Sequence, residues 1–519
     1  MAYTLLQIGA KVEGCVADDA CGYNATAAIA EGVKYPNIRT MTVGTTTTSY
    51  TPLAELGVPP TLLWTPANPA ALGQGYWTAT SAVCWYFGKG LYDKLQIPIG
   101  LISSNWGGTI IESWVDNATL SQCPKPPGDQ SGLELSNRGL GVGVAVSPMN
   151  YTYKGQGFIA KGGDVATVNA TVKEAEAMCT GIPACQGLTF RSNSSDCDGK
   201  VCKILLKNQA TYTNASGWQS YTNTRVPRPN TGPGINSGQG VLYNAMINPL
   251  TPMAVAGFVW FQGESDSAPP QNLTYSCLQQ GLIKLWREQF YASSTAFFGF
   301  VELEPWFRQG PWGDGPVPEL RQAQLESCSL PNVGYATATD CGDPLSADGS
   351  IHPRMKKRIA DRLVASALTL RYKLPTVYLP PTYAGATAMS SGRSVMVTVY
   401  FNDLPTKLVA AHDYCKTHML AQNGSGVWFS TGLSASLCSW FTIIGSDGGR
   451  YNATATPTPD GKQLVLTATV NQSGTTAIAT SFGWNSWPIN TIMSAEGLPL
   501  QPWPDEMVNA TISSHTVAL

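Results

Sequence analysis

The amino-acid sequence predicts an α/β fold: a mainly parallel β-sheet, interrupted by a small disulfide-rich insertion and followed by a C-terminal antiparallel β-sandwich. Three observations support this fold class. Apolar runs of strand length alternate with helical patterns up to residue 373, which is typical of a parallel sheet covered by helices. Cysteines lie at short spacing within residues 150–225, and β-forming segments separated by turns fill residues 374–519.

Four apolar runs in the first part of the chain have the composition of strands buried on both faces. Each run leads directly into polar residues, as expected where parallel strands end at one edge of a sheet and present side chains to a site. Two other segments, residues 79–95 and 355–372, carry apolar side chains at helical spacing. The four predicted strands span residues 97–102, 253–260, 296–301 and 333–339.

Residues 150–225 interrupt this alternation and predict a separate, inserted module. Its even set of cysteines is expected to form disulfides in a unit too small for a large core. The cysteine spacing, together with a Trp-Gln-Ser-Tyr block at residues 218–221, resembles a PAN/apple-type module. Such modules commonly bind protein or carbohydrate, and a passive structural role is the alternative. The cysteines are Cys179, Cys185, Cys197 and Cys202.

The carboxyl-terminal part of the chain is β-patterned. Residues 395–400, 463–469 and 476–481 gather β-forming side chains between Gly, Pro and Asn turns, which predicts an antiparallel β-sandwich. We expect this sandwich to pack against the preceding domain rather than to bind sugar. The predicted domains are 1–149 and 226–373 for the two parts of the α/β domain, 150–225 for the insertion, and 374–519 for the sandwich.

Three polar blocks occur in order along the α/β part. Residues 100–114 read Gly-Leu-Ile-Ser-Ser-Asn-Trp-Gly-Gly-Thr-Ile-Ile-Glu-Ser-Trp, residues 260–266 read Trp-Phe-Gln-Gly-Glu-Ser-Asp, and residues 351–354 read Ile-His-Pro-Arg. In this order the blocks resemble the sialate O-acetylesterase family, a branch of the SGNH-type serine hydrolases. Further matches are residues 81–92, 321–324 and 497–499, so the resemblance covers most of the chain outside the insertion.

This resemblance implies an SGNH-hydrolase-like three-layer fold around the parallel sheet. It also implies a carbohydrate O-acetylesterase, which hydrolyses acetyl esters on sialic acid or related glycans by a Ser-His-Asp mechanism, with no cofactor and no metal. An O-acetylated glycan is the implied substrate. A non-catalytic relative that binds glycan or protein is the alternative.

The nucleophile is the point at which the sequence departs from the family. The family's first block, Gly-Gln-Ser-Asn-Met, carries the nucleophilic serine and does not occur in this sequence. The resemblance aligns Met1 with the last residue of that block, which places the nucleophile just upstream and leaves residues 1–519 inactive by themselves. Ser104 and Ser265 are weaker alternatives. Family members often have a serine near the position of Ser104 without using it, and Ser265 lacks the second glycine of a G-x-S-x-G elbow.

His352 is the predicted general base, because imidazole titrates near neutral pH and the other three histidines lie in the β-patterned tail. An acid shortly before it in the chain can orient the imidazole. The SGNH pattern is Asp-x-x-His, but here Asp348 stands four residues before the histidine. Asp348 is the preferred orienting acid, and Asp343 or Asp340 could hold the role instead.

Donors for the tetrahedral oxyanion are expected in the first two polar blocks. The backbone N–H groups of Gly107 and Gly108 are the candidates, because a residue without Cβ allows a substrate to approach closely. The side-chain amide of Gln262 can add a further donor. Glu264 is expected to brace the loops beneath the site rather than to act on the substrate.

Composition indicates a protein of the secretory route. The chain has 13 cysteines and only 13% charged residues, and an odd number of cysteines leaves one thiol unpaired. No signal segment stands at its start, but the cysteines, the low charge and the sequons favour a secreted or lysosomal (endomembrane lumen) location for the full-length protein. The net charge of −2 gives no basic footprint for nucleic acid, and no apolar run is long enough to span a membrane. Asn-x-Ser/Thr sequons stand at Asn24, Asn117, Asn150, Asn169, Asn193, Asn214, Asn272, Asn423, Asn452, Asn471 and Asn509.

Overall fold

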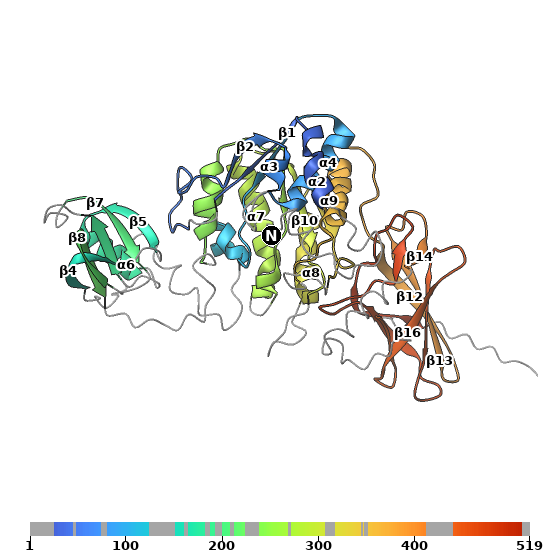
Figure 1. The fold of residues 1–519 in the computed structure, drawn as a ribbon. Helices are drawn as coiled ribbons and strands as arrows, with labels where there is room; N and C mark the ends of the chain where they lie inside the picture. Colours follow the sequence, from blue (N-terminus) through green and yellow to red (C-terminus); the bar gives the residue numbers. More distant parts are fainter. Residues whose placement is uncertain are drawn as a thin grey trace, which may run out of the picture. The chain divides into compact units, whose positions relative to one another are not determined.

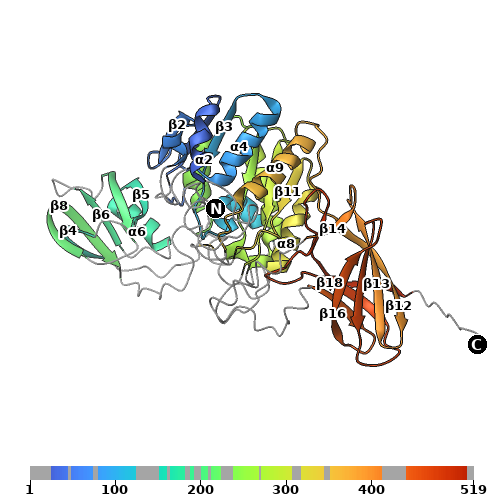
Figure 2. The same ribbon diagram turned by 45° about the vertical axis from the view of Figure 1, so that its right-hand side comes forward.

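The computed structural model divides the described part of the chain into two compact units, drawn in Figures 1 and 2. The first unit contains the described residues up to Val43, residues 60–111 and the described residues from Pro252 onward. The second contains residues from 44 to 59 and from 112 to 251. The described residues are 25–44, 48–73, 80–123, 151–159, 164–181, 187–191, 200–207, 212–223, 238–267, 271–306, 317–343, 346, 351–411 and 440–510.

Two three-stranded sheets stand at the centre of the first unit. Their strands are β1 (Ile38–Thr42), β2 (Leu62–Pro66), β3 (Ile99–Ser103), β9 (Gly257–Trp260), β10 (Phe297–Glu302) and β11 (Val333–Thr337). In the first sheet, with order β2-β1-β3, β1 runs parallel to β3 and antiparallel to β2. In the second, with order β11-β10-β9, all strands are parallel.

The four predicted strands are confirmed as β3, β9, β10 and β11, but they do not form the single sheet that the sequence led us to expect. The described strands of the α/β part form two sheets, and β3 and β9 each stand at the end of their own sheet. Within the described ranges each of these two strands has one hydrogen-bonded neighbour. The mixed α/β architecture is confirmed, whereas the three-layer arrangement of an SGNH hydrolase stays a prediction.

The two sheets share one hydrophobic core. A single buried cluster contains Leu101 of β3, Val301 of β10 and Ala336 of β11. The helices α4 (Ala82–Leu95) and α9 (Lys356–Leu370) lie side by side and contribute to the same cluster (Figures 1 and 2). Burial of these apolar side chains therefore stabilises both sheets together.

The two predicted helices are confirmed, and the chain around α4 shows how its ends are set. The side chain of Ser81 accepts a hydrogen bond from the backbone N–H of Cys84 at 3.5 Å, as an N-cap residue does. After Leu95, Gln96 adopts a left-handed conformation with φ of 55°, which ends the helix. The first unit also contains α2 (Ala25–Ala30), η1 (Glu31–Lys34), α3 (Pro69–Leu72), η6 (Glu264–Asp266), η7 (Gln271–Leu273), α7 (Tyr275–Gln289), α8 (Val317–Leu325) and η8 (Glu326–Ser329).

An eight-stranded sheet, antiparallel except for one pair, follows α9 in the chain. Its order is β20-β18-β15-β16-β17-β13-β12-β21, and only β12 and β21 are parallel. Its core cluster joins Val397 of β13 with Phe441 of β15 and Trp503 of β20, so the sheet encloses one core. The expected antiparallel β-structure is confirmed, but it is one continuous sheet with a separate two-stranded piece, β14-β19. The strands are β12 (Thr382–Ser391), β13 (Ser394–Asn402), β14 (Leu408–Ala410), β15 (Phe441–Gly445), β16 (Arg450–Pro457), β17 (Leu464–Thr469), β18 (Ala477–Phe482), β19 (Ile492–Ser494), β20 (Trp503–Met507) and β21 (Asn509–Ala510).

Arg321 on α8 joins this carboxyl-terminal part to the α/β part. Its guanidinium donates to the carbonyls of Leu303 and Glu304 at 2.7 and 3.0 Å, at the end of β10. It also donates to the carbonyls of Asn485 and Ser486 at 2.8 and 3.1 Å. The expected packing of the carboxyl-terminal domain against the preceding one is therefore confirmed.

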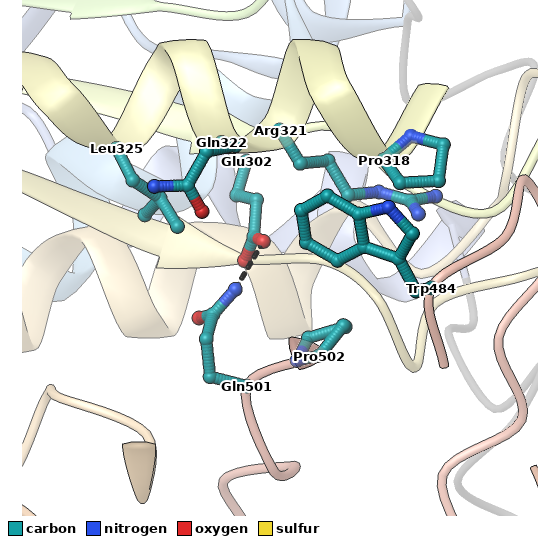
Figure 3. Close-up of a pocket in the computed structure, with 8 residues that line it drawn as sticks. All are labelled: Glu302, Pro318, Arg321, Gln322, Leu325, Trp484, Gln501 and Pro502. Atoms are coloured by element: carbon teal, nitrogen blue, oxygen red, sulfur yellow. Dashed lines mark hydrogen bonds between the residues drawn. The ribbon is translucent and has the colours of Figure 1, made fainter. Parts of the chain in front are cut away.

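A small cavity lies beside this arginine (Figure 3). Its space of about 10 Å³ suits one water molecule. The buried carboxylate of Glu302 faces Gln501, whose amide donates to Glu302 Oε1 at 2.5 Å, as the dashed line in Figure 3 marks. Tyr335 in turn donates its hydroxyl to Gln501 Oε1 at 3.3 Å. Figure 3 also shows Trp484 and Pro502 on the side of the carboxyl-terminal segment.

The second unit contains a five-stranded antiparallel sheet with order β4-β8-β6-β7-β5. The helix α6 (Val172–Gly181) packs Ala175 and Cys179 into the same small core as Phe190 and Ile204. Cys179 is in a disulfide, and so is Cys202. Cys185 and Cys197 lie outside the described residues. The strands are β4 (Tyr151–Ile159), β5 (Asp164–Ala170), β6 (Gly187–Arg191), β7 (Cys202–Lys207) and β8 (Tyr212–Asn223). Other elements are α5 (Asn117–Gln122), the π-helix η4 (Tyr243–Ile247), η5 (Asn248–Leu250), and η2 (Ile111–Trp114), which begins in the first unit.

The cysteines of the described ranges correct one expectation. Among the described residues Cys84, Cys328 and Cys341 are free, which is more than the one unpaired thiol that the odd cysteine count led us to expect. None of the helices within the described ranges is long and apolar enough to cross a membrane.

Candidate active site

His352 lies in the loop that leads into α9, at the carboxyl-terminal end of the parallel strands. The residue is half-buried, and its backbone carbonyl accepts a hydrogen bond from the Ser346 hydroxyl at 2.6 Å. Two residues further on, the backbone N–H of Arg354 donates to Asp343 at 3.0 Å. These bonds hold the loop from both sides of the imidazole, as a general base requires if its ring is to keep one orientation.

The two alternative orienting acids are both engaged by buried arginines. Asp343 receives Arg354 Nε at 2.6 Å and Nη2 at 2.8 Å. Asp340 receives Arg362 Nη1 and Nη2 at 2.6 and 2.8 Å. Burial alone would raise the pKa of Asp340, but the charge and hydrogen bonds of Arg362, with Arg358 nearby, lower it below its usual value.

These ion pairs give Asp343 and Asp340 a structural role, since each carboxylate is bound in a bidentate manner. They fix the loop that carries the histidine instead of meeting its ring. Asp348 lies outside the described residues, so its place relative to His352 stays a prediction. Because Arg354 binds Asp343 and Arg362 binds Asp340, Asp348 remains the preferred candidate for orienting the imidazole.

Gly107 and Gly108 form an exposed turn after β3. Gly108 has a φ of +73°, a conformation that favours glycine, whereas the φ of Gly107 lies outside that range. A Cβ built on either residue would meet no atom within 4 Å. The turn therefore presents its backbone to open space, as an oxyanion-binding turn must.

Gln262 holds this turn from the next loop. Its Nε2 donates to the carbonyl of Thr109 at 2.9 Å and also to the carboxylate of Asp266. Its Oε1 accepts the hydroxyl of Tyr275 at 2.9 Å. Both amide hydrogens thus donate to protein groups in this structure, and the oxyanion role of Gln262 stays a prediction.

Asp266 and Tyr275 are residues of this site that sequence reasoning missed. The Asp266 carboxylate is fully buried and accepts the backbone N–H of Ile111 at 3.3 and 3.1 Å. It thereby bridges the block after β3 and the block after β9. Asp266 stands inside a recognised block, but its partner is 155 residues away in sequence, so no local pattern could identify the contact.

Glu264 lies beneath these loops, close to Glu304 and Lys356, and burial raises its pKa. Its Oε1 is buried without a hydrogen-bond partner among the described residues. The bracing role of Glu264 stays a prediction. Ser104 and Ser265 are both partly exposed.

Comparison with known proteins adds independent information. No protein-family model matches the chain. It is 32% identical to the sialate O-acetylesterase of Mus musculus over 323 residues, which are 60% of this chain and 46% of that protein. It is 29% identical to the sialate O-acetylesterase of Homo sapiens over 362 residues, which are 67% of this chain and 50% of the human protein. The chain thus spans about half the length of the curated relatives that it matches.

A solved structure supports the fold. The crystal structure of a carbohydrate acetylesterase from Xanthomonas citri matches 97% of this chain and 77% of that protein, with a TM-score of 0.58 and 21% sequence identity. At this level of identity the match establishes a shared fold.

Proposed function

We propose that the chain is a member of the sialate O-acetylesterase family, whose mouse and human proteins it matches at 32% and 29% identity, and that it represents a carbohydrate O-acetylesterase acting on sialic acid or related glycans. The observation that carries the proposal is the pair of hydrogen-bonded links between the first two family blocks. Gln262 binds the carbonyl of Thr109, and Asp266 binds the N–H of Ile111. These links hold the Gly107–Gly108 turn at the end of β3 in a fixed relation to the loop after β9.

The nucleophile in this proposal is the serine of the family's first block, Gly-Gln-Ser-Asn-Met, which does not occur in residues 1–519. Support comes from β3 and β9, which share a core while each lacks a second neighbour within the described ranges. A parallel strand between them would complete one sheet. Its carboxyl end would then lie between the two linked loops, where a nucleophile could meet the turn's N–H groups.

The proposed reaction is an acyl transfer to serine followed by hydrolysis. His352 takes the hydroxyl proton as the serine oxygen bonds to the acetyl carbonyl, and the N–H groups of Gly107 and Gly108 stabilise the oxyanion. The sugar alcohol leaves with the proton from His352. Water, deprotonated by the same imidazole, then releases acetate. Asp348 is the proposed partner that keeps the imidazole in the correct tautomer.

Replacement of Gly107 by alanine tests the turn. A Cβ there meets nothing within 4 Å, so the free energy of unfolding should change by about 0.5 kcal/mol or less. A substrate placed against the backbone N–H would meet the methyl group. We expect kcat/KM for p-nitrophenyl acetate to fall by about 10²-fold, comparable to the loss of an oxyanion donor.

This measurement applies to a chain extended by its upstream segment, with thermal melting recorded alongside. Gly392→Ala is a useful companion, because its site is also open but lies in the carboxyl-terminal sheet, between β12 and β13, and has a φ of +59°. It should cost stability without changing activity per folded molecule. Unchanged kinetics in Gly107→Ala would remove the turn from the mechanism.

The second candidate function is binding by the residue 151–223 module, and it too is a proposal. Two features favour it. Tyr153 is 49% exposed on β4, and the Arg191 guanidinium lies 5.3 Å from the ring centroid of Trp218. Aromatic faces of this kind bind protein or carbohydrate ligands. Such binding would operate with or without esterase activity.

A secretory location is proposed for the full-length protein, and the sequons offer a test with an internal control. Asn452 and Asn471 are exposed, whereas Asn272 is buried with 8% exposure. In a secretory host, Asn452→Gln and Asn471→Gln should each remove one glycosidase-sensitive mass increment, and Asn272→Gln should remove none. A chain without any such increment would argue against the secretory route.

A further inference from the structure

A buried group of charged side chains connects the histidine loop with the loop after β9. We propose that Lys356 is a positioning residue that sets the distance between His352 and the Gly107–Gly108 turn, through a buried cluster with Glu264 and Glu304. The role of Lys356 in turnover rests on the proposed esterase function. The cluster itself is a property of the fold and can be tested without turnover.

Lys356 is the first residue of α9 and stands four residues after His352. Its side chain is fully buried, which is rare for lysine unless the ammonium is paired. Its Nζ lies 4.5 Å from the ring centroid of Phe261, a cation–π distance. Phe261 immediately precedes Gln262, so the ammonium contacts the loop that holds the Gly107–Gly108 turn.

The two acids come from the ends of two neighbouring strands. Glu264 follows β9, and Glu304 follows β10. Glu304 is fully buried, and neither of its carboxylate oxygens has a hydrogen-bond partner among the described residues. In such surroundings a carboxylate is stabilised mainly by a nearby cation, and the Lys356 ammonium supplies that charge.

The protonation of the cluster follows from its burial. Burial raises the pKa of Glu304 to about 7, against the attraction of Lys356 and with added repulsion from Glu264. Burial also lowers the pKa of Lys356. The negative charges of Glu304 and Glu264 raise it, as do Cys341 and Asp343 in the loop between β11 and α9. Protonation of Glu304 below about pH 7 removes one negative charge from the cluster, and its ionisation above that pH adds one.

Loss of the ammonium should therefore separate the two loops. Without Lys356, Glu264 and Glu304 repel each other in a dry environment, and the start of α9 loses its contact with Phe261. His352 would then shift relative to the turn that Gln262 holds. A misplacement of about 1 Å can cost about 10²-fold in rate, and it should lower kcat more than it raises KM.

Lys356→Met and Lys357→Met form a matched pair. Lys357 is the next residue and makes a surface pair with Asp361, with side chains 30% and 51% exposed. In the chain extended by its upstream segment, we expect Lys356→Met to lower kcat for p-nitrophenyl acetate about 10- to 100-fold at pH 8, with KM changed less than about threefold. Lys357→Met should match the parent protein.

The pH dependence separates positioning from simple loss of packing. Relative to the parent enzyme, the defect of Lys356→Met should shrink at pH 6, because protonation of Glu304 removes the repulsion. The double variant Lys356→Met/Glu304→Gln should recover activity at pH 8 for the same reason. A defect that is equal at both pH values, or that Glu304→Gln does not relieve, would overturn the positioning role.

A stability measurement keeps the inference testable if the esterase proposal fails. Urea unfolding of the parent, Lys356→Met, Glu304→Gln and the double variant gives the coupling between the two side chains. Coupling in a protein without turnover would contradict the proposed function but not the cluster. Additive effects of the two substitutions would contradict the cluster, whatever the activity.

Discussion

His352→Ala is expected to lower kcat/KM for p-nitrophenyl acetate by at least about 10³-fold in the chain extended by a segment ending Gly-Gln-Ser-Asn. The reason is that His352 is the proposed general base, and imidazole titrates near neutral pH. His352 sits in a loop fixed by Ser346 on one side and by the Arg354–Asp343 ion pair on the other. The same substitution removes no buried contact of that ion pair, so the melting temperature should change little.

Three comparisons make the result decisive. His515→Ala should retain full activity. Residues 1–519 without the upstream segment should show no enzyme-like turnover, and turnover there that His352→Ala abolishes would return Ser104 or Ser265 as the nucleophile. Activity in the extended chain that survives His352→Ala would remove the Ser-His-Asp mechanism.

The orienting acid can be resolved in the same assay. Asp348→Asn should lower kcat more than Asp343→Asn when rates are compared per folded molecule. Asp343→Asn has a different expected cost, because it leaves the buried Arg354 guanidinium without its bidentate partner and so destabilises the protein. The reverse order of the kcat values would show that Asp343 orients His352.

Local patterns predicted the elements of this protein well, because a strand or helix is set by its own periodicity. The unbroken apolar run before Phe261 and the helical spacing after Met355 appear as β9 and α9. Strand pairing depends instead on neighbours remote in sequence. The sequence therefore could not show that β3 and β9 end separate sheets, or that the carboxyl-terminal strands form one continuous sheet.

The site shows the same limit. The Gly107–Gly108 turn was predictable, because glycine's conformational freedom is a property of the residue itself. The engagement of Gln262 was not, because it depends on Thr109 and on the buried carboxylate of Asp266. One block that resembled the family, residues 321–324, had no role assigned from the sequence. In residues 321–324, Gln324 donates to the carbonyl of Gln262 at 3.1 Å and so supports the same loop.

Arg321→Met is expected to have the largest effect on stability, about 3–5 kcal/mol. Four backbone carbonyls at the junction of the α/β part and the carboxyl-terminal sheet accept hydrogen bonds from this one buried guanidinium. An unsatisfied buried acceptor costs about 1–3 kcal/mol, although the carbonyls can recover part of this by admitting water. The substitution also removes a cation that lowers the pKa of the buried Glu302 carboxyl, which burial raises.

Gln322→Met provides the control, because Gln322 is the next residue on α8 and its side chain is exposed. By thermal melting we expect a decrease of about 3–5 °C in Arg321→Met and almost none in Gln322→Met. A second, separate transition in Arg321→Met would follow from the same cause, since Arg321 binds both Glu304 after β10 and Ser486 in the carboxyl-terminal part. Equal melting temperatures for the two variants would mean that the apolar contacts around Trp484 and Pro502 hold the two parts together without the arginine. In that case, the carboxyl-terminal sheet would be attached by hydrophobic packing alone.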